Sequence, residues 1–172
     1  MKYQIFFLLI FISNYVISQN GSVITWEDSG YGGDSSAVSS DLSSGVTEIF
    51  SNNRAFAALK TDGSVITWGN SVGGGDSSAV SSDLSSGVTE IYPNALAFAA
   101  LKTDGSVFTW GNSTRGGDSS TVSIDISSGV AEIFSTEEAF AALKTDGSVI
   151  TWGNSSQGGD SSAVSSDLSS GT

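Results

Sequence analysis

The stretch Gly21-Ser22-Val23-Ile24-Thr25-Trp26 recurs at residues 63–68, 105–110 and 147–152, with Phe in place of Ile at position 108. Each copy begins 42 residues after the one before it. A fixed period of about 20 to 50 residues is typical of solenoids and propellers, whose units bury their apolar faces against copies of themselves. The sequence therefore predicts a tandem array with repeats at 21–62, 63–104 and 105–146 and a partial repeat at 147–172.

Each repeat carries three short stretches typical of β-strands. In the first complete unit these are residues 46–50, 55–61 and 64–68, which are rich in β-branched, aromatic and small apolar residues. Asp62-Gly63 separates the last two stretches, and this dipeptide favours a hairpin with a type I′ turn. The pattern predicts an all-β chain.

A long Gly- and Ser-rich connection follows each tryptophan strand. A connection of this length without structure is uncommon in a compact unit. We therefore expect a fourth, edge strand or a single helical turn around Val80 and Leu84. The strand is favoured, because serine side chains compete with a helical backbone for hydrogen bonds.

The first 18 residues have the pattern of a secretory signal peptide. A basic start at Lys2 precedes the apolar run 5–12, and small Ser18 offers a cleavage site before Gln19. The run is about half of the roughly 20 residues that span a bilayer. The sequence thus predicts a signal peptide at 1–18, a repeat domain at 19–172, and a secreted or extracellular surface location.

The composition restricts the partners. The net charge is −12, and loss of Lys2 leaves 5 basic and 18 acidic residues, or 5 − 18 = −13. Nucleic acids and anionic membranes bind clustered basic residues. The remaining basic residues are dispersed, so we expect no nucleic-acid partner and no membrane insertion after signal cleavage: Arg54, Lys60, Lys102, Arg115, Lys144.

The sequence offers little for catalysis or for a cofactor. It contains no His and no Cys, so the common general base and the thiol nucleophile are both missing. The three strand-end lysines are interpreted as solvated. Each GGDSS motif supplies one Asp, whereas a calcium loop needs several alternating ligands. We predict no enzyme activity, metal or cofactor, and a turn-capping role for these Asp residues.

Four tryptophans occupy the same position in the four copies: Trp26, Trp68, Trp110 and Trp152. A ladder of aromatic rings is compatible with a carbohydrate platform. A tryptophan that closes a strand in every copy is better explained as the residue that buries the interface between neighbouring units.

The repeat resembles that of the regulator of chromosome condensation (RCC) family. The residues that carry the resemblance are Ala58-Leu59, Asp62-Gly63, Val65 and Trp68-Gly69-Asn70 with their later copies. The resemblance implies a β-propeller with one repeat per blade, usually seven in a ring. The repeat is shorter than in the nuclear exchange factor that names the family and is closer to the compact blades of a secreted bacterial β-lactamase-inhibitor propeller. The usual His before the Ala-Leu strand is absent, so nucleotide exchange is not implied.

The number of blades leaves three alternatives open. Complete three-strand units span 46–68, 88–110 and 130–152, and Ser22 to Trp26 is a lone third strand. Three units cannot close a ring of about four to eight blades. The chain is then a fragment of a longer array, an open arc of a partial RCC-like propeller, or a protein that self-associates through its incomplete terminal blades.

Differences between the copies indicate a binding surface. Repeats 63–104 and 105–146 differ at 12 of 42 positions, and six of these lie at 72–73 and 93–96. Strand direction places both tracts on one rim, opposite the constant Asp-Gly turns. Varied loops on a constant scaffold are a common way to present binding residues, although drift in exposed loops produces the same pattern. The candidates are Tyr31, Asn52, Asn53, Arg54, Leu96, Arg115, Glu137, Glu138 and Gln157.

Two functions fit these observations. The first is a secreted protein-binding scaffold that uses this rim. The alternative is a structural or adhesive surface array without a specific ligand, which glycosylation at Asn20, Asn112 and Asn154 would suit, because each begins an acceptor triplet.

Overall fold

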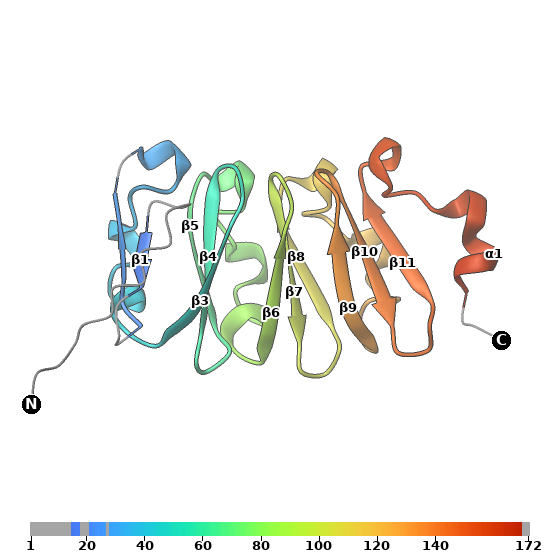
Figure 1. The fold of residues 1–172 in the computed structure, drawn as a ribbon, viewed down its shortest axis with the longest axis horizontal. Helices are drawn as coiled ribbons and strands as arrows, with labels where there is room; N and C mark the ends of the chain where they lie inside the picture. The colour runs from blue at the N-terminus through green and yellow to red at the C-terminus, as the bar shows by residue number, and fades with distance from the viewer. Residues whose placement is uncertain (1–14, 18–20, 27, 170–172) are drawn as a thin grey trace, which may run out of the picture.

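The fold was analysed in a computed structural model that describes residues 15–17, 21–26 and 28–169. Three antiparallel three-stranded sheets stand side by side in a row, and a two-stranded hairpin lies beside the first (Figure 1). The chain is all-β with short helical turns in its connections, and the row of sheets is open rather than closed into a ring. None of the described helices is long and apolar enough to cross a membrane.

The three predicted strands of each repeat are confirmed. In every sheet the second strand of the repeat lies in the centre and pairs with the other two. The strands are β3 (Val46–Ser51), β4 (Ala55–Lys60), β5 (Val65–Gly69), β6 (Val88–Pro93), β7 (Ala97–Lys102), β8 (Val107–Gly111), β9 (Val130–Ser135), β10 (Ala139–Lys144) and β11 (Val149–Gly153).

The first tryptophan strand is not alone, which corrects the sequence prediction. This strand, β2 (Val23–Thr25), pairs with β1 (Tyr15–Ile17) in an antiparallel hairpin. Ile17 lies opposite Val23, as Leu59 lies opposite Val65 one 42-residue period later. The end of the predicted signal peptide thus occupies the central-strand position of a repeat.

The predicted type I′ turn is wrong. Gly63 N–H donates to Lys60 O at 2.9 Å, and Lys60 N–H donates to Ser64 O at 2.9 Å. This pattern defines a three-residue loop, in which a type I turn is followed by a left-handed residue in a bulge. Gly63 supplies that residue with φ 75°. A single glycine is therefore enough, and the Asp62 side chain caps the turn instead.

The favoured edge strand is also wrong, because the long connections fold into short 3-10 helices. Serine hydroxyls within them donate back to carbonyls three residues earlier, as Ser81 does to Ser78 at 3.0 Å, and so support a helical turn. Leu84 anchors the connection in the core. The helices are η1 (Ser29–Tyr31), η2 (Ser36–Val38), η3 (Asp41–Ser43), η4 (Ser71–Gly73), η5 (Ser78–Val80), η6 (Asp83–Ser85), η7 (Ser113–Arg115), η8 (Ser120–Val122), η9 (Ser155–Gln157), η10 (Ser162–Val164) and α1 (Ser165–Leu168).

The core lies between sheets rather than within one. Leu59 and Val65 of the first sheet pack in one cluster with Ile91, Phe98 and Trp110 of the second. The equivalent residues of the second and third sheets form the next cluster. Small alanines on the central strand allow this close approach. Each unit therefore completes its core only when a neighbour covers it, as expected of a repeat array.

The tryptophans connect successive units. Trp110 stacks on Phe98 with ring centroids 5.2 Å apart, and its indole N–H donates to Gly74 O at 3.0 Å, in the preceding connection. Trp68 and Trp152 make the same contacts with Gly32 and Gly116. The interface role predicted for these three residues is confirmed.

Candidate functional site: the variable rim

The two variable tracts of each repeat are joined by a side-chain hydrogen bond. Asn52 Nδ2 donates to Gly73 O at 2.7 Å, and Asn94 Nδ2 donates to Arg115 O at 2.6 Å. The first strand-connecting turn of each sheet therefore lies against the helix that follows its tryptophan strand. We call this end of the array, made of turns 52–54, 94–96 and 136–138 with helices η1, η4, η7 and η9, the variable rim (Figure 1).

Backbone hydrogen bonds connect the turns of neighbouring sheets. Asn53 N–H donates to Ala95 O at 3.2 Å, and Ala95 N–H donates to Glu137 O at 3.1 Å. The three turns thus form one continuous line. Side chains on this line are held at fixed separations, although their identities differ from repeat to repeat.

Asn52 positions the rim and is not free to bind. Its Oδ1 accepts hydrogen bonds from Arg54 N–H and Ala55 N–H, each at 2.9 Å, while its Nδ2 bonds to Gly73. In the third sheet Thr136 replaces the asparagine. Its hydroxyl donates to Gln157 O and accepts from Ala139 N–H, each at 3.0 Å. Asn and Thr at this position therefore play the same role, which is to join the turn to the following helix.

Arg115 and Glu138 neutralise each other. An Arg115 guanidinium nitrogen lies 2.9 Å from Glu138 Oε1, and both side chains are half-buried. Asn154 Nδ2 donates to the other carboxylate oxygen. The pair joins the second sheet's helix η7 to the third sheet's turn. Leu96, at the position of Glu138 in the second sheet, is also half-buried.

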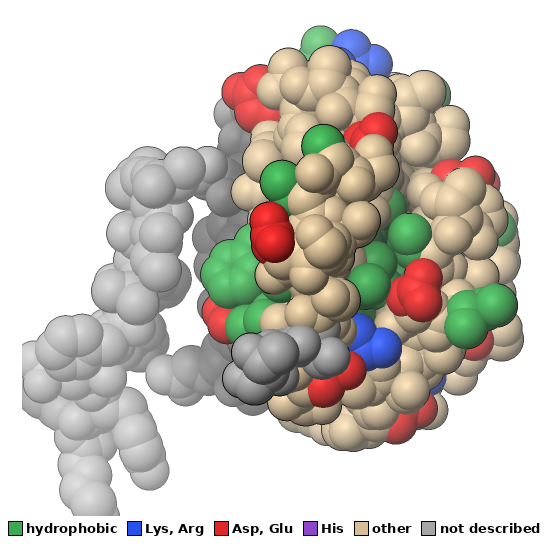
Figure 2. Space-filling model, turned by 90° about the vertical axis from the view of Figure 1, so that its right-hand side faces the viewer, with side chains coloured by type: hydrophobic (Ala, Val, Ile, Leu, Met, Phe, Trp, Pro, Cys, Tyr) green, Lys and Arg blue, Asp and Glu red, His purple; other side chains and the backbone are tan. Residues whose placement is uncertain are grey.

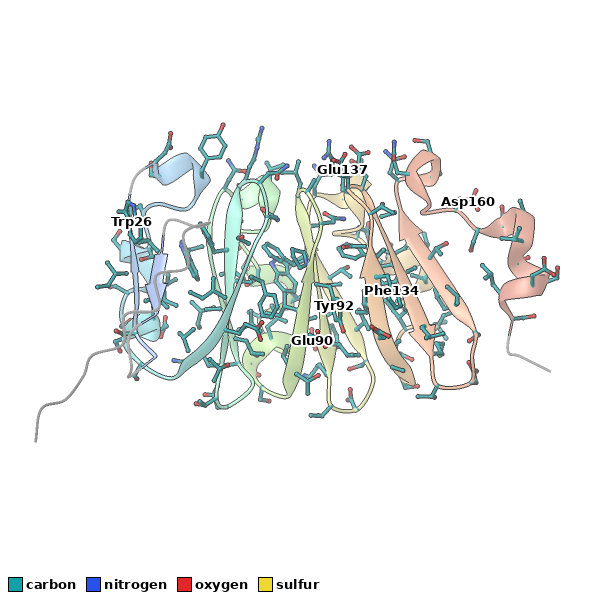
Figure 3. The ribbon with its side chains drawn as sticks, in the orientation of Figure 1. Trp26, Glu90, Tyr92, Phe134, Glu137 and Asp160 are labelled. Atoms are coloured by element: carbon teal, nitrogen blue, oxygen red, sulfur yellow. The ribbon has the colours of Figure 1, made fainter. Side chains whose placement is uncertain are left out.

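The remaining candidates are exposed on the rim: Tyr31, Asn53, Arg54, Glu137 and Gln157. Val72 on η4 is exposed as well, and the candidate list omitted it although its position varies between copies. Aromatic, aliphatic and basic groups lie toward the first sheet, and acidic Glu137 lies toward the third (Figure 3). The rim therefore has different chemistry at its two ends.

The opposite rim is constant for a structural reason. Val88 N–H donates to Gly63 O at 3.0 Å, and a Cβ on Gly63 would lie 2.7 Å from Gly87 N. Asp62 Oδ1 accepts from the Ser64 hydroxyl at 2.6 Å and from Ser64 N–H at 3.0 Å, and these bonds hold the pKa of this carboxyl below its usual range. Gly63 closes a contact with the next unit and Asp62 caps its own turn, so these two positions have little freedom to vary.

The GGDSS motifs are turns rather than ligand sites. A Cβ on Gly74 would lie 2.9 Å from Phe98, and one on Gly75 would lie 2.3 Å from Gly69 O. Asp76 Oδ1 accepts from Ser78 N–H at 2.9 Å at the start of η5. This confirms the capping role predicted for the motif. Among the residues described, no group of three acidic, His or Cys side chains is arranged to hold a metal ion.

The three strand-end lysines are bonded to the protein, so their interpretation as solvated groups needs correction. Lys60 Nζ donates to Asp41 O at 2.7 Å, and Lys102 and Lys144 make the same bond to Asp83 O and Asp125 O. Each ammonium group thereby satisfies a backbone carbonyl in the connection before its own sheet, in η3 for Lys60, in η6 for Lys102 and in a turn for Lys144. Their recurrence in all three sheets is explained by this contact, with no need for a chemical role.

Comparison with known proteins supports the fold. No family model matches the chain, and no curated protein matches its sequence. Among solved structures, yeast RCC1 (Prp20), crystallised bound to Kap60, superposes with a TM-score of 0.53 at 17% identity, over 81% of this chain and 41% of that one. The fold is that of an RCC1-like repeat array. It spans about two fifths of the length of the yeast protein.

Two further structures give lower scores. The ectodomain of the receptor kinase CR4 from Physcomitrella patens has a TM-score of 0.43 at 18% identity, over 63% of this chain and 29% of that one. The computationally designed Ika8 protein has a TM-score of 0.41 at 15% identity, over 83% and 44%.

Proposed function

We propose that the chain is a protein-binding scaffold that contacts its partner through the variable rim. The observation that carries this proposal is the line of backbone hydrogen bonds through Asn53, Ala95 and Glu137, which fixes the turns while their exposed side chains differ. Rigid elements that present variable side chains provide specificity at low entropic cost. The yeast RCC1 structure, in which an RCC1-like array is bound to Kap60, is consistent with such a role.

The exposed rim residues suggest the chemistry of the partner. Tyr31 and Val72 offer aromatic and aliphatic contacts near the first sheet, and Arg54 adds a cation. Glu137 adds an exposed carboxylate at the other end, whereas the charge of its neighbour Glu138 is neutralised by Arg115. A complementary protein surface would place an acidic or apolar patch against the first turn and a basic group against the third.

The compartment is part of the proposal and rests on the N-terminal sequence. We infer export, with cleavage between Ser18 and Gln19. Cleavage at this point would remove β1 and leave β2 without its paired strand. Expression in a secretion-competent host followed by N-terminal sequencing tests the inference. A secreted chain that begins at Gln19 agrees with it, whereas a chain that stays in the cytosol with residues 1–18 attached contradicts it.

Exchange of rim tracts between repeats tests the binding function. Residues 135–138 and 114–115 are replaced together by the sequences of 93–96 and 72–73, Pro-Asn-Ala-Leu and Val-Gly. The exchange removes Glu137 and both members of the Arg115–Glu138 pair, and the incoming Asn retains the bond from turn to helix. A partner captured by crosslinking from the extracellular medium should bind the exchanged protein at least about tenfold more weakly, a change of about 1.4 kcal/mol.

Thr61→Lys on the constant rim is the matched control, because Thr61 is exposed and occupies a turn position that accepts most residues. It should leave binding unchanged. Equal binding by the wild-type and exchanged proteins would contradict the proposal and favour the structural or adhesive array.

A further inference from the structure

The last described sheet leaves its outer face uncovered. Phe134 on β9 is 52% exposed, whereas Phe50 and Tyr92 at the same position are packed against the next sheet. Val149 and Leu143 are half-buried, although their copies Val65 and Leu59 are buried. Figure 2 looks onto this end and shows hydrophobic side chains at several places on it.

The connection that follows β11 is unsupported for the same reason. Leu168 is half-buried, whereas its copies Leu42, Leu84 and Ile126 are almost fully buried. Val164 is exposed, and residues 165–168 form α1 in place of the usual 3-10 turn. These side chains complete the core of the next unit wherever a next unit is present.

The first unit exposes the opposite half of the same contact. Trp26 is 41% exposed and Ile24 is 65% exposed, while Trp68 at the next position is buried. Each of the three later tryptophans donates its indole N–H to a glycine carbonyl 36 residues earlier. Among the described residues, Trp26 has no such carbonyl.

Gly158 is the unused counterpart of that carbonyl. It adopts the same left-handed conformation as Gly32, Gly74 and Gly116, with φ 100°. A Cβ on those three glycines would collide with the phenylalanine of the next unit, whereas at Gly158 nothing lies within 4 Å. Among the residues described, no indole donates to Gly158. Within the described residues, one end of the array therefore carries an acceptor without an indole donor and the other an indole without its acceptor.

We propose that these two ends dock head to tail between two copies of this chain. Trp26 of one copy stacks over Gly158 of the other and donates to its carbonyl, as Trp152 does to Gly116 at 3.1 Å. Phe134, Val149 and Leu168 become the buried floor beneath Ile24 and Trp26. The occupant is a second copy because the internal interface, repeated between all three sheets, is the template for the contact.

The contact joins two different surfaces, so it is heterologous rather than two-fold between like patches. All the residues that form it lie within 19–172. Cleavage before Gln19 would keep these residues but would remove β1, the strand paired with β2. Apart from Gly158, which caps the rim helix η9, the contact uses residues outside the turns and helices that define the variable rim, so it differs from the proposed binding function.

Single substitutions at each end test the docking. In light scattering coupled to gel filtration, the wild-type protein should have a mass above that of one chain. Phe134→Glu and, separately, Trp26→Arg should each weaken association by roughly ten- to a hundredfold. Phe134→Tyr should associate normally, because Tyr92 fills this position in the second sheet. Ile124→Ser removes an exposed side chain in the connection between the second and third sheets, which the proposed contact does not use, and should have no effect.

Mixing the two defective proteins determines the direction of the contact. The Phe134→Glu protein keeps an intact first unit, and the Trp26→Arg protein keeps an intact last sheet. A heterologous contact therefore re-forms in the mixture, although each protein alone associates weakly. Association of the Trp26→Arg protein by itself as strongly as the wild type would overturn the proposal in favour of a contact between like ends. A wild-type protein that stays monomeric throughout the concentration range, or one dissociated by Ile124→Ser, would also overturn it.

Discussion

At the residue scale, Asn94 separates support of the rim from recognition by it. It is buried, and it holds Leu96 N–H, Ala97 N–H and Arg115 O with three hydrogen bonds. Asn94→Ala should lower the free energy of unfolding by about 2 kcal/mol, because it leaves buried backbone groups unpaired. Asn94→Thr should cost less than about 1 kcal/mol, since Thr136 makes equivalent bonds in the third sheet.

Urea unfolding measures these differences, and exposed Asn53→Ala should stay within about 0.5 kcal/mol of wild type. A cost for Asn94→Ala no larger than that of Asn53→Ala would show that the turn holds its shape without the side chain.

The candidate residues could be placed on one rim from the sequence, because successive antiparallel strands reverse direction and bring turns 52–54 and helix η4 to the same end. Their individual roles could not be predicted. Asn52 and Asn53 are adjacent and both polar, yet one is bonded to three backbone groups and the other is exposed. The hydrogen-bond distances in the structure are needed to distinguish the capping side chain of Asn52 from the exposed side chain of Asn53.

At the element scale, the strands were predictable and the connections were not. The strands follow from β-branched and aromatic stretches repeated in phase. Asp-Gly alone does not specify the turn after Lys60, because the predicted type I′ turn and the observed three-residue loop differ in their backbone hydrogen bonds. The serine-rich connections became helical because hydroxyls such as that of Ser85 bond within the turn and Leu84 is buried. Strand β1 was not predicted, because it lies in an N-terminal stretch whose sequence fits a signal peptide equally well.

The Asp caps make the hairpins sensitive to acid. Side-chain and backbone hydrogen bonds from Ser106 lower the pKa of Asp104 in the folded state. A depressed folded-state pKa stabilises the fold above the unfolded pKa, near 3.8, and this stabilisation is lost as pH falls through the folded pKa. Asp104→Asn retains an acceptor oxygen but cannot titrate, so its thermal midpoint should fall less than that of wild type between pH 6 and pH 2.

Asp104→Ala provides the comparison, because it removes the acceptor at every pH and should destabilise the protein even at pH 6. Identical pH profiles for the wild-type and Asp104→Asn proteins would show that this carboxylate contributes no pH-dependent stability.

At the scale of the whole molecule, the repeat period predicts how many copies the head-to-tail contact unites. A second copy that continues the array places its Trp26 one period after Trp152, at position 194, which is 168 residues or four periods beyond 26. The described residues of each copy supply four tryptophan strands, namely β2, β5, β8 and β11. Two copies supply eight, which lies within the roughly four to eight blades that propellers close.

Heterologous contacts form a ring when their rotation closes and a filament when it does not. Because eight units are at the upper end of this range, we expect closure at two copies, with both ends of each chain occupied. Sedimentation velocity should then show one species with twice the mass of a single chain and no growth as concentration rises. The equimolar mixture of Phe134→Glu and Trp26→Arg proteins can form only one of the two contacts. Its dimer should therefore dissociate at a much higher protein concentration than the wild-type dimer. A wild-type series of trimers, tetramers and larger species would contradict closure, because it requires a free end on every assembly.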